Sequence, residues 1–174
     1  DTNAFRVVNG EGDALPGIVL DRYGEVFVLR LYSKAWERHL SALVEAIVEV
    51  VRPRPLFRRF GVATVDDRQG GETLRGPAPA EVMVGHEHGV KLLVRVRDGQ
   101  KTGMFLDQRE HRRLVRGWSN GRDVVNLFAY NGGFSISAAL GGARRVTTVD
   151  IAAAALEDAK EIFRLNGVDP GAHA

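Results

Sequence analysis

One stretch of the sequence, Asn126 to Asp150, limits the folds open to this chain more than any other. It reads "NLFAYNGGFSISAALGGARRVTTVD": a β-rich run, an adjacent glycine pair, a helical run, and a second β-rich run that ends in an acid. We expect strands at 123–128 and 145–150, and helices at 134–140 and from 152 to Asn166-Gly167. Strand, helix, strand, helix in this order opens a doubly wound parallel sheet, so the predicted fold class is α/β.

The carboxyl ends of these two strands predict a site for an adenosine-bearing ligand. Open α/β sheets bind ligands at that edge, and an acid about 20 residues after the glycine turn reaches ribose hydroxyls, as Asp150 would here. Gly132 and Gly133 would let a ligand approach the backbone without meeting a Cβ. The alternative for Asp150 is a cap for the helix that follows, and one carboxylate can serve both purposes.

The residues of the turn favour one adenosine ligand over another. A pyrophosphate calls for three spaced glycines, whereas this turn supplies only an adjacent pair. Phe128, Tyr130 and Phe134 crowd the turn and present aromatic faces that suit a sulfonium, although packing into a core is their alternative role. The spacing therefore favours S-adenosylmethionine over NAD, which stays as the alternative.

The sequence before residue 98 predicts a small α+β domain. Its expected elements are a hairpin at 17–32, an amphipathic helix at 34–51, a short strand at 55–60, a loop at 64–80 and a second hairpin at 81–99. We therefore expect two domains, 1–97 and 98–174. The second opens with a loop that feeds a helix, with four apolar side chains on its inner face: Leu106, Leu114, Val115 and Trp118.

Composition excludes several classes of protein. The 174 residues are 44% hydrophobic and 26% charged, which is ordinary for a globular protein, and no apolar run is long enough to cross a bilayer. The absence of cysteine excludes disulfides, thiolate metal sites and a cysteine nucleophile, and it fits a cytoplasmic location. His86 and His88 lack a third ligand at fixed spacing, so no metal site is expected.

The arginines gather in two groups although the formal net charge is only +2. The groups are Arg52, Arg54, Arg58, Arg59 and Arg68, and then Arg109, Arg112, Arg113 and Arg116. Each group is either a solvated surface or a patch that faces phosphates.

Four stretches together resemble successive motifs of one enzyme family. They are "NGEGDALPGIVLDRYG", "QKTGMFLDQREHR", "NLFAYNGGFSISAALGGA" and "VTTVDIAAAALEDAKEIFRLNG", and they occur in order over nearly the whole chain. The family is the S-adenosylmethionine-dependent RNA methyltransferases that modify cytosine C5 in large-subunit ribosomal RNA. The resemblance implies a central α+β domain followed by a Rossmann-like methyltransferase domain.

The resemblance also implies roles for particular residues. The loop that wraps the methionine part of the cofactor corresponds to the segment Asn126–Phe134, which holds Asn126, Phe128, Tyr130, Gly132, Gly133 and Phe134. Asp150 would hold the ribose and Ile151 would lie against the adenine. Lys101 and Gln108 belong to a segment that would lie over the cofactor. Arg109, Arg112 and Arg113 would contact RNA, with a solvent-facing helix surface as the alternative.

The resemblance leaves parts of the family's pattern unmatched. An RNA-binding PUA domain, an Asp-Pro-Pro-type motif and a catalytic cysteine have no counterpart in the 174 residues. We therefore expect a fragment, inactive alone, that joins the central domain to the N-terminal half of the methyltransferase domain. Two strands would leave an apolar edge exposed. Expected partners are ribosomal RNA and a second copy in a homodimer, with no membrane. A non-catalytic RNA-binding fragment, or a methyltransferase for another base or RNA, is the alternative.

Overall fold

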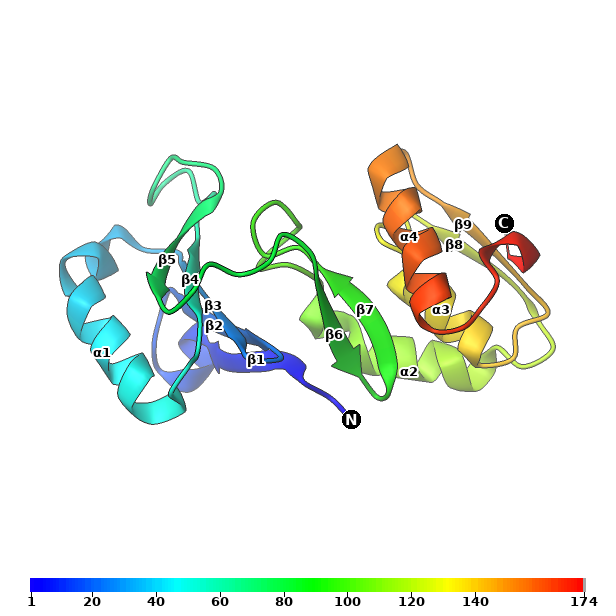
Figure 1. The fold of residues 1–174 in the computed structure, drawn as a ribbon, viewed down its shortest axis with the longest axis horizontal. Coiled ribbons are helices and arrows are strands. Elements are labelled where there is room, and N and C mark those ends of the chain that lie inside the picture. Colours follow the sequence, from blue (N-terminus) through cyan, green and yellow to red (C-terminus); the bar gives the residue numbers. More distant parts are fainter. Residues whose placement is uncertain (174) are drawn as a thin grey trace. The chain divides into compact units, whose positions relative to one another are not determined.

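The computed structural model describes residues 1–173, which form two compact units. The N-terminal unit comprises Asn3–Gly85 and Val94–Leu106, and the C-terminal unit comprises His86–Leu93 and the residues from Asp107 on, together with Asp1–Thr2. The division runs through a hairpin, so the units interleave along the chain (Figure 1). The domain boundary expected near residue 98 stays a prediction.

The N-terminal unit is built on a five-stranded sheet in the order β1-β2-β3-β4-β5. Its strands are β1 (Ala4–Asn9), β2 (Ile18–Tyr23), β3 (Val26–Leu31), β4 (Leu56–Arg59) and β5 (Gly71–Arg75). All neighbouring pairs are antiparallel except β3 and β4, which are parallel and joined through helix α1 (Leu40–Val51). Leu20, Leu29 and Leu56 are fully buried in the core that α1 helps to cover. The predicted hairpin at 17–32 is confirmed as β2–β3.

Two expectations for this unit are corrected. The helix predicted at 34–51 begins as a 3-10 helix (Lys34–His39), and its α-helical part starts only at Leu40. The predicted loop at 64–80 contains β5, a strand at the sheet's edge that pairs with β4. Four of its five residues are exposed, so it carries no apolar alternation that sequence patterning could detect.

A hairpin links the two units along the chain. It consists of β6 (Met83–Glu87) and β7 (Val90–Val94). His88 and Gly89 form its turn with φ of 48° and 78°, the paired positive values of a type I′ turn. The expected second hairpin is therefore confirmed, although its strands are shorter than the predicted range 81–99.

The C-terminal unit contains the predicted strand–helix–strand–helix arrangement. After a 3-10 turn (Leu106–Gln108) come α2 (Arg109–Trp118), β8 (Asp123–Leu127), α3 (Gly133–Leu140), β9 (Arg145–Val149) and α4 (Ala153–Leu165). Strands β8 and β9 are parallel, with Asn126 opposite Thr148. Val146 and Ala138 are fully buried between the sheet and α3. The predicted α/β class is confirmed.

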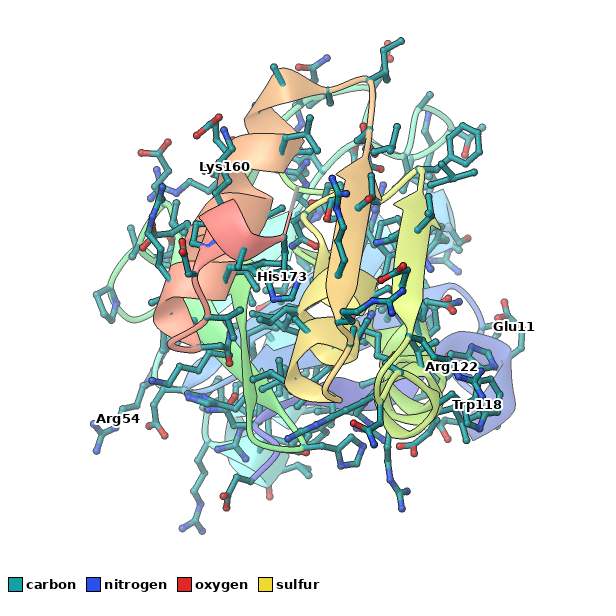
Figure 2. The ribbon with its side chains drawn as sticks, turned by 90° about the vertical axis from the view of Figure 1, so that its right-hand side faces the viewer. Glu11, Arg54, Trp118, Arg122, Lys160 and His173 are labelled. Atoms are coloured by element: carbon teal, nitrogen blue, oxygen red, sulfur yellow. The ribbon has the colours of Figure 1, made fainter. Side chains whose placement is uncertain are left out.

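Among the described residues of the C-terminal unit, no helix covers the other face of the β8–β9 sheet (Figure 2). Val125, Leu127 and Val149 on this face are exposed by 63%, 60% and 44%. Alternation along the strands places them opposite the residues that pack on α3.

Of the four apolar residues predicted for the inner face at α2, Leu106 is buried and Val115 packs against the core beneath α3, but Leu114 and Trp118 are wrong. Leu114 and Trp118 are exposed by 48% and 61%, and Arg112 is the one residue of α2 that is buried. Arg112 is drawn inward by an acidic partner on β6, which is described below.

No helix among residues 1–173 is both long and apolar enough to cross a membrane.

Candidate cofactor site

The turn between β8 and α3 is a compact loop with an unusual backbone. Phe128, Tyr130 and Gly132 all have positive φ, at 56°, 51° and 76°. The amide of Ala129 donates to the carbonyl of Val149 at 3.0 Å, so the loop stays tied to the end of β9. Two non-glycine residues held in this sparsely populated region mark a loop whose shape is over-determined by its surroundings.

The two glycines permit different close approaches. A Cβ on Gly132 would lie 2.7 Å from the Cβ of Ala159 on α4, and its φ favours glycine independently. A Cβ on Gly133 would lie 3.2 Å from the Cδ of Arg112 on α2. The glycine pair therefore lets the start of α3 sit tightly against two neighbouring helices.

Asp150 joins the two loops at the carboxyl ends of the strands. Its Oδ2 accepts a hydrogen bond from the amide of Tyr130 at 2.7 Å, and its Oδ1 accepts one from the amide of Ala152 at 2.9 Å. These bonds, that of Ala152 first, lower the pKa of Asp150, so the carboxylate is ionised at neutral pH. Each oxygen keeps a further lone pair, which suits it to accept a hydroxyl donor such as a ribose. The N-cap of α4 is Ala152 and not Asp150, so the predicted cap role is wrong, although Asp150 does bind the amide of that N-cap residue.

Ser135 is a buried polar residue that sequence reasoning missed. Its Oγ lies 2.9 Å from both the Nδ2 of Asn126 and the Oγ1 of Thr148, and so connects α3 with both strands. The signal in the sequence was a pair of serines, Ser135 and Ser137, inside a helical run that is otherwise apolar. Asn126 is thereby oriented on the inner face of β8.

Apolar side chains at the strand ends are open to solvent. Phe128, which follows the end of β8, is 92% exposed. Ile151, which follows Asp150 after the end of β9, is fully exposed. Core packing, the alternative role for Phe128, is therefore wrong. Phe134 is half-buried, and its ring centroid lies 5.9 Å from the guanidinium carbon of Arg112. A fixed carboxylate beside exposed apolar groups fits a ribose that carries a flat aromatic base.

Lys101 and Gln108 belong to different units of the chain. Lys101 belongs to the N-terminal unit, where its backbone carbonyl accepts a hydrogen bond from Arg30 at 2.8 Å and its Nζ lies 4.8 Å from the ring centroid of Phe105. Gln108 belongs to the C-terminal unit and bonds to His111 at 3.0 Å. Their contacts with a cofactor stay predictions.

A buried polar network fixes the loop that carries Lys101. Asp21 is fully buried, and its carboxylate accepts hydrogen bonds from Arg6 at 2.8 and 3.1 Å and from the hydroxyl of Thr102 at 2.5 Å. The hydroxyl of Tyr23 lies 2.8 Å from that of Thr102. Burial, followed by the charge of Asp21, raises the pKa of Tyr23. Asp21 therefore has a structural role in this unit.

The arginines expected to contact RNA occupy different environments. Arg112 is 6% exposed and makes hydrogen bonds of 2.5 to 2.9 Å to Glu87, which is 4% exposed. Burial raises the pKa of Glu87 and outweighs the opposing effect of Arg112. The pair anchors α2 to β6, so Arg112 is corrected from an RNA contact to a structural ion pair. Arg109 and Arg113 reach the surface.

The two histidines of the hairpin do not gather metal ligands. Within residues 1–173, no cluster of three or more His, Cys, Asp or Glu side chains could hold a metal ion. His88 instead lies 3.2 Å from Glu110 on α2.

Comparison with known proteins places the chain in a family. The family of S-adenosylmethionine-dependent methyltransferases matches residues 64–174, and the chain belongs to that family. Its cofactor is S-adenosylmethionine, which confirms the preference over NAD drawn from the glycine spacing.

Particular relatives are more informative still. The chain is similar to a ribosomal RNA large subunit methyltransferase of Deinococcus radiodurans, with 44% identity over 95% of this chain and 42% of the relative. It is 39% identical to ribosomal RNA large subunit methyltransferase I of Klebsiella pneumoniae, over 96% of this chain and 42% of the relative. The chain thus spans less than half the length of these curated relatives.

Solved structures show the same fold. A methyltransferase from Streptococcus mutans matches with a TM-score of 0.89 and 31% identity, over 99% of this chain and 45% of that one. A methyltransferase solved with S-adenosylhomocysteine (SAH) matches with a TM-score of 0.89 and 30% identity, over 99% of this chain and 44% of that one.

Proposed function

We propose that this chain is the cofactor-binding part of a cytoplasmic enzyme that methylates large-subunit ribosomal RNA. The observation that carries the proposal is the Asp150 carboxylate, held by two backbone amides between exposed apolar residues at the strand ends. The names of the relatives support ribosomal RNA as the substrate. Cytosine C5 is the proposed target atom, on the resemblance of the four sequence motifs.

The residues of the loop would divide the binding of the cofactor among them. When bound, S-adenosylmethionine supplies a methyl group on a sulfonium. Asp150 would accept hydrogen bonds from the ribose hydroxyls, and Ile151 would cover the adenine. The turn at Gly132 would follow the methionine part without a Cβ in the way. Rate enhancement then comes mainly from holding the methyl group in line with the base carbon.

Methylation at cytosine C5 also calls for covalent activation of the base. A nucleophile adds to C6 and so makes C5 reactive. The 174 residues contain no cysteine, so a cysteine nucleophile would have to come from outside this sequence. We therefore propose that the 174-residue chain binds the cofactor and does not transfer the methyl group by itself.

Titration calorimetry with SAH and with NAD tests the cofactor. We expect the chain to bind SAH and not NAD, and Asp150→Asn to weaken SAH binding because the amide cannot accept as strongly from the ribose. Asp67→Asn is the matched control, since Asp67 is an exposed loop residue of the other unit. Binding of NAD alone, or unchanged SAH affinity in Asp150→Asn, would refute the site.

The target base is tested in the organism that carries the gene. Deletion of the gene should remove one 5-methylcytidine from the large-subunit ribosomal RNA, as read by mass spectrometry of its nucleosides. Loss of another methylated nucleoside would assign a different base, and loss of a nucleoside from another RNA would assign a different substrate. The proposed homodimer is checked by light scattering on the purified chain.

A further inference from the structure

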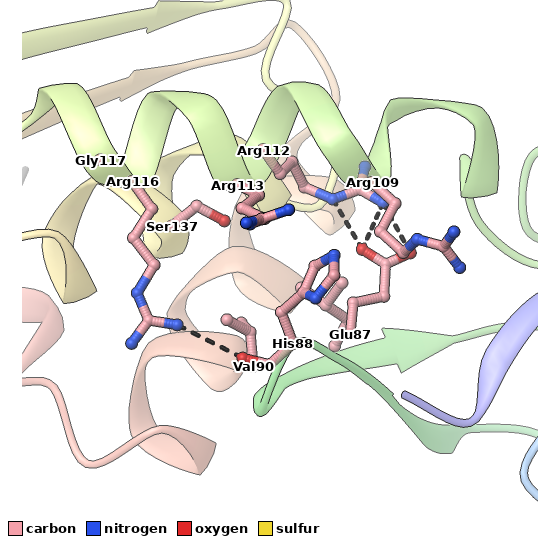
Figure 3. Close-up of a pocket in the computed structure, with 10 residues that line it drawn as sticks. Glu87, His88, Val90, Arg109, Arg112, Arg113, Arg116, Gly117 and Ser137 are labelled. Atoms are coloured by element: carbon pink, nitrogen blue, oxygen red, sulfur yellow. Dashed lines mark hydrogen bonds and ion pairs between the residues drawn. The ribbon is translucent and has the colours of Figure 1, made fainter. Parts of the chain in front are cut away.

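The surface of α2 carries a pocket that the cofactor site does not use. Arg109, Arg112, Arg113 and Arg116 follow the spacing of one helix face, and the tip of the β6–β7 hairpin lies opposite them (Figure 3). The pocket between them has a volume of about 390 Å³. Val90 and Leu92 line it from the hairpin, and Ser137 lines it from α3. All of these residues belong to the C-terminal unit.

Three cationic or protonatable side chains that line this pocket contact one carboxylate, that of Glu110, which is not itself a lining residue. The Oε1 of Glu110 lies 3.2 Å from the Nε of Arg109 and 3.2 Å from the Nε2 of His88, and its Oε2 lies 3.4 Å from an Nη of Arg113. Hydrogen bonds, that of Arg109 first and that of His88 second, lower the pKa of Glu110. The convergence shows that these side chains can surround a single anionic group.

Another anion can take the position of the Glu110 carboxylate among these side chains. The Glu110 side chain is 57% exposed, so it can turn toward water without leaving a buried charge unpaired. The pair Glu87–Arg112 cannot do so because it is buried. Arg116, which donates to the carbonyl of His88 at 3.4 Å, adds a further positive charge at the rim. A phosphate diester carries one negative charge and so matches the charge of the carboxylate it would replace.

We propose that this pocket binds one nucleotide of the RNA substrate, with a backbone phosphate taking the place of the Glu110 carboxylate among Arg109, Arg113 and His88. The pocket is larger than a phosphate requires, and the additional space accommodates the attached ribose. The ligand class rests on the proposed function, and the pocket is separate in its residues from the cofactor loop. Glu110 then acts as an internal competitor of the RNA.

Two substitutions that change the charge of this cluster in opposite directions test whether it binds an RNA phosphate. Affinity is measured by fluorescence anisotropy of a labelled single-stranded RNA oligonucleotide, at several salt concentrations. Glu110→Gln should raise the affinity roughly two- to fivefold, because it releases the three groups from their competitor. Arg113→Ala should lower the affinity and reduce the slope of log K against log salt by about 0.7, the value for one phosphate contact on a single strand.

Helix α4 offers matched controls with the same geometry and the same changes in charge. Glu161 and Arg164 form an exposed pair at the i,i+3 spacing, as Glu110 and Arg113 do. Glu161→Gln and Arg164→Ala should leave RNA affinity within error of the unchanged chain. Equal effects at both helices, or no gain in Glu110→Gln, would overturn the proposal.

SAH calorimetry on the same variants keeps the two proposals apart. We expect unchanged SAH affinity in Glu110→Gln and Arg113→Ala, with unfolding temperatures measured to show that both variants are folded. A chain that binds RNA through these residues but binds no SAH would contradict the proposed cofactor site and support the nucleotide pocket. A chain that binds SAH while its RNA affinity ignores these substitutions would overturn the pocket alone.

Discussion

The ion pair between Arg112 and Glu87 provides the sharpest test of how the C-terminal unit is held together. Arg112→Met would leave the Glu87 carboxylate buried and without its guanidinium partner. Both side chains are at most 7% exposed, and the three hydrogen bonds between them span 2.5 to 2.9 Å. Removing one member of such a pair costs about 3–5 kcal/mol. For a domain of this size, that corresponds to a fall in unfolding temperature of roughly 12–40 °C.

The stability lost in Arg112→Met should depend on pH in a predictable direction. The pKa of Glu87 is already raised in the folded protein, and loss of Arg112 raises it further. A carboxyl whose folded pKa exceeds its unfolded pKa binds more protons when folded, so stability falls as pH rises through that window. Arg112→Met should therefore be more damaging at neutral pH than at a pH near the ordinary range of glutamate.

Urea unfolding combined with hydrogen exchange measures the effect where it arises. Amides of α2 and β6 should lose protection, whereas those of β2 and β3 in the other unit should not. The control is the double variant Glu87→Leu/Arg112→Met, which replaces the pair by apolar groups and should recover most of the stability. A cost below about 1 kcal/mol for Arg112→Met, the range of exposed pairs, would refute the reasoning. So would a double variant as unstable as the single one.

Three further predictions concern the loops. The pKa of Asp150 is lowered in the folded chain, so its carboxylate stabilises the turn at pH values above the ordinary pKa of aspartate. That stabilisation is lost as the pH falls through the lowered pKa. An NMR titration midpoint of Asp150 at or above the ordinary value would contradict this prediction. Gly132→Ala should cost about 1–3 kcal/mol by thermal unfolding, because its Cβ would lie 2.7 Å from a side-chain carbon of α4, whereas Gly117→Ala, with nothing within 4 Å, should not destabilise the chain. Thr102→Val removes the hydroxyl that donates to the buried Asp21 at 2.5 Å and should cost about 1–3 kcal/mol in urea unfolding; a neutral result would show that Arg6 alone satisfies the carboxylate.

The sequence predicts the β8–α3 loop and its flanking elements well because local signals there agree with one another. An apolar run, a glycine pair, a helical run and a terminal acid all point to the same strand–turn–helix–strand unit, and β8, α3 and β9 match it to within a few residues. The hydrogen bonds of Asp150 to two separate loops could not be predicted, since they depend on how the strand ends meet in space.

The errors arise where a tertiary partner overrides the local pattern. Apolar spacing on α2 favoured Leu114 and Trp118 as the inner face, but Glu87 on β6 draws Arg112 inward instead. An arginine is rarely buried unless it is paired, and the partner lies 25 residues away in the sequence. Strand β5 was missed for a related reason, because its pairing with β4 supplies order that its polar residues do not signal.

The uncovered face of β8 and β9 has a consequence for the colloidal behaviour of the chain in solution. Val125, Leu127 and Val149 present exposed apolar side chains on one face of a parallel sheet. Contiguous apolar surface of this kind promotes self-association that grows with protein concentration. A purified sample should therefore become turbid as it is concentrated and clear on addition of mild detergent, and substituting threonine for Val125 and Val149 should extend the working concentration range.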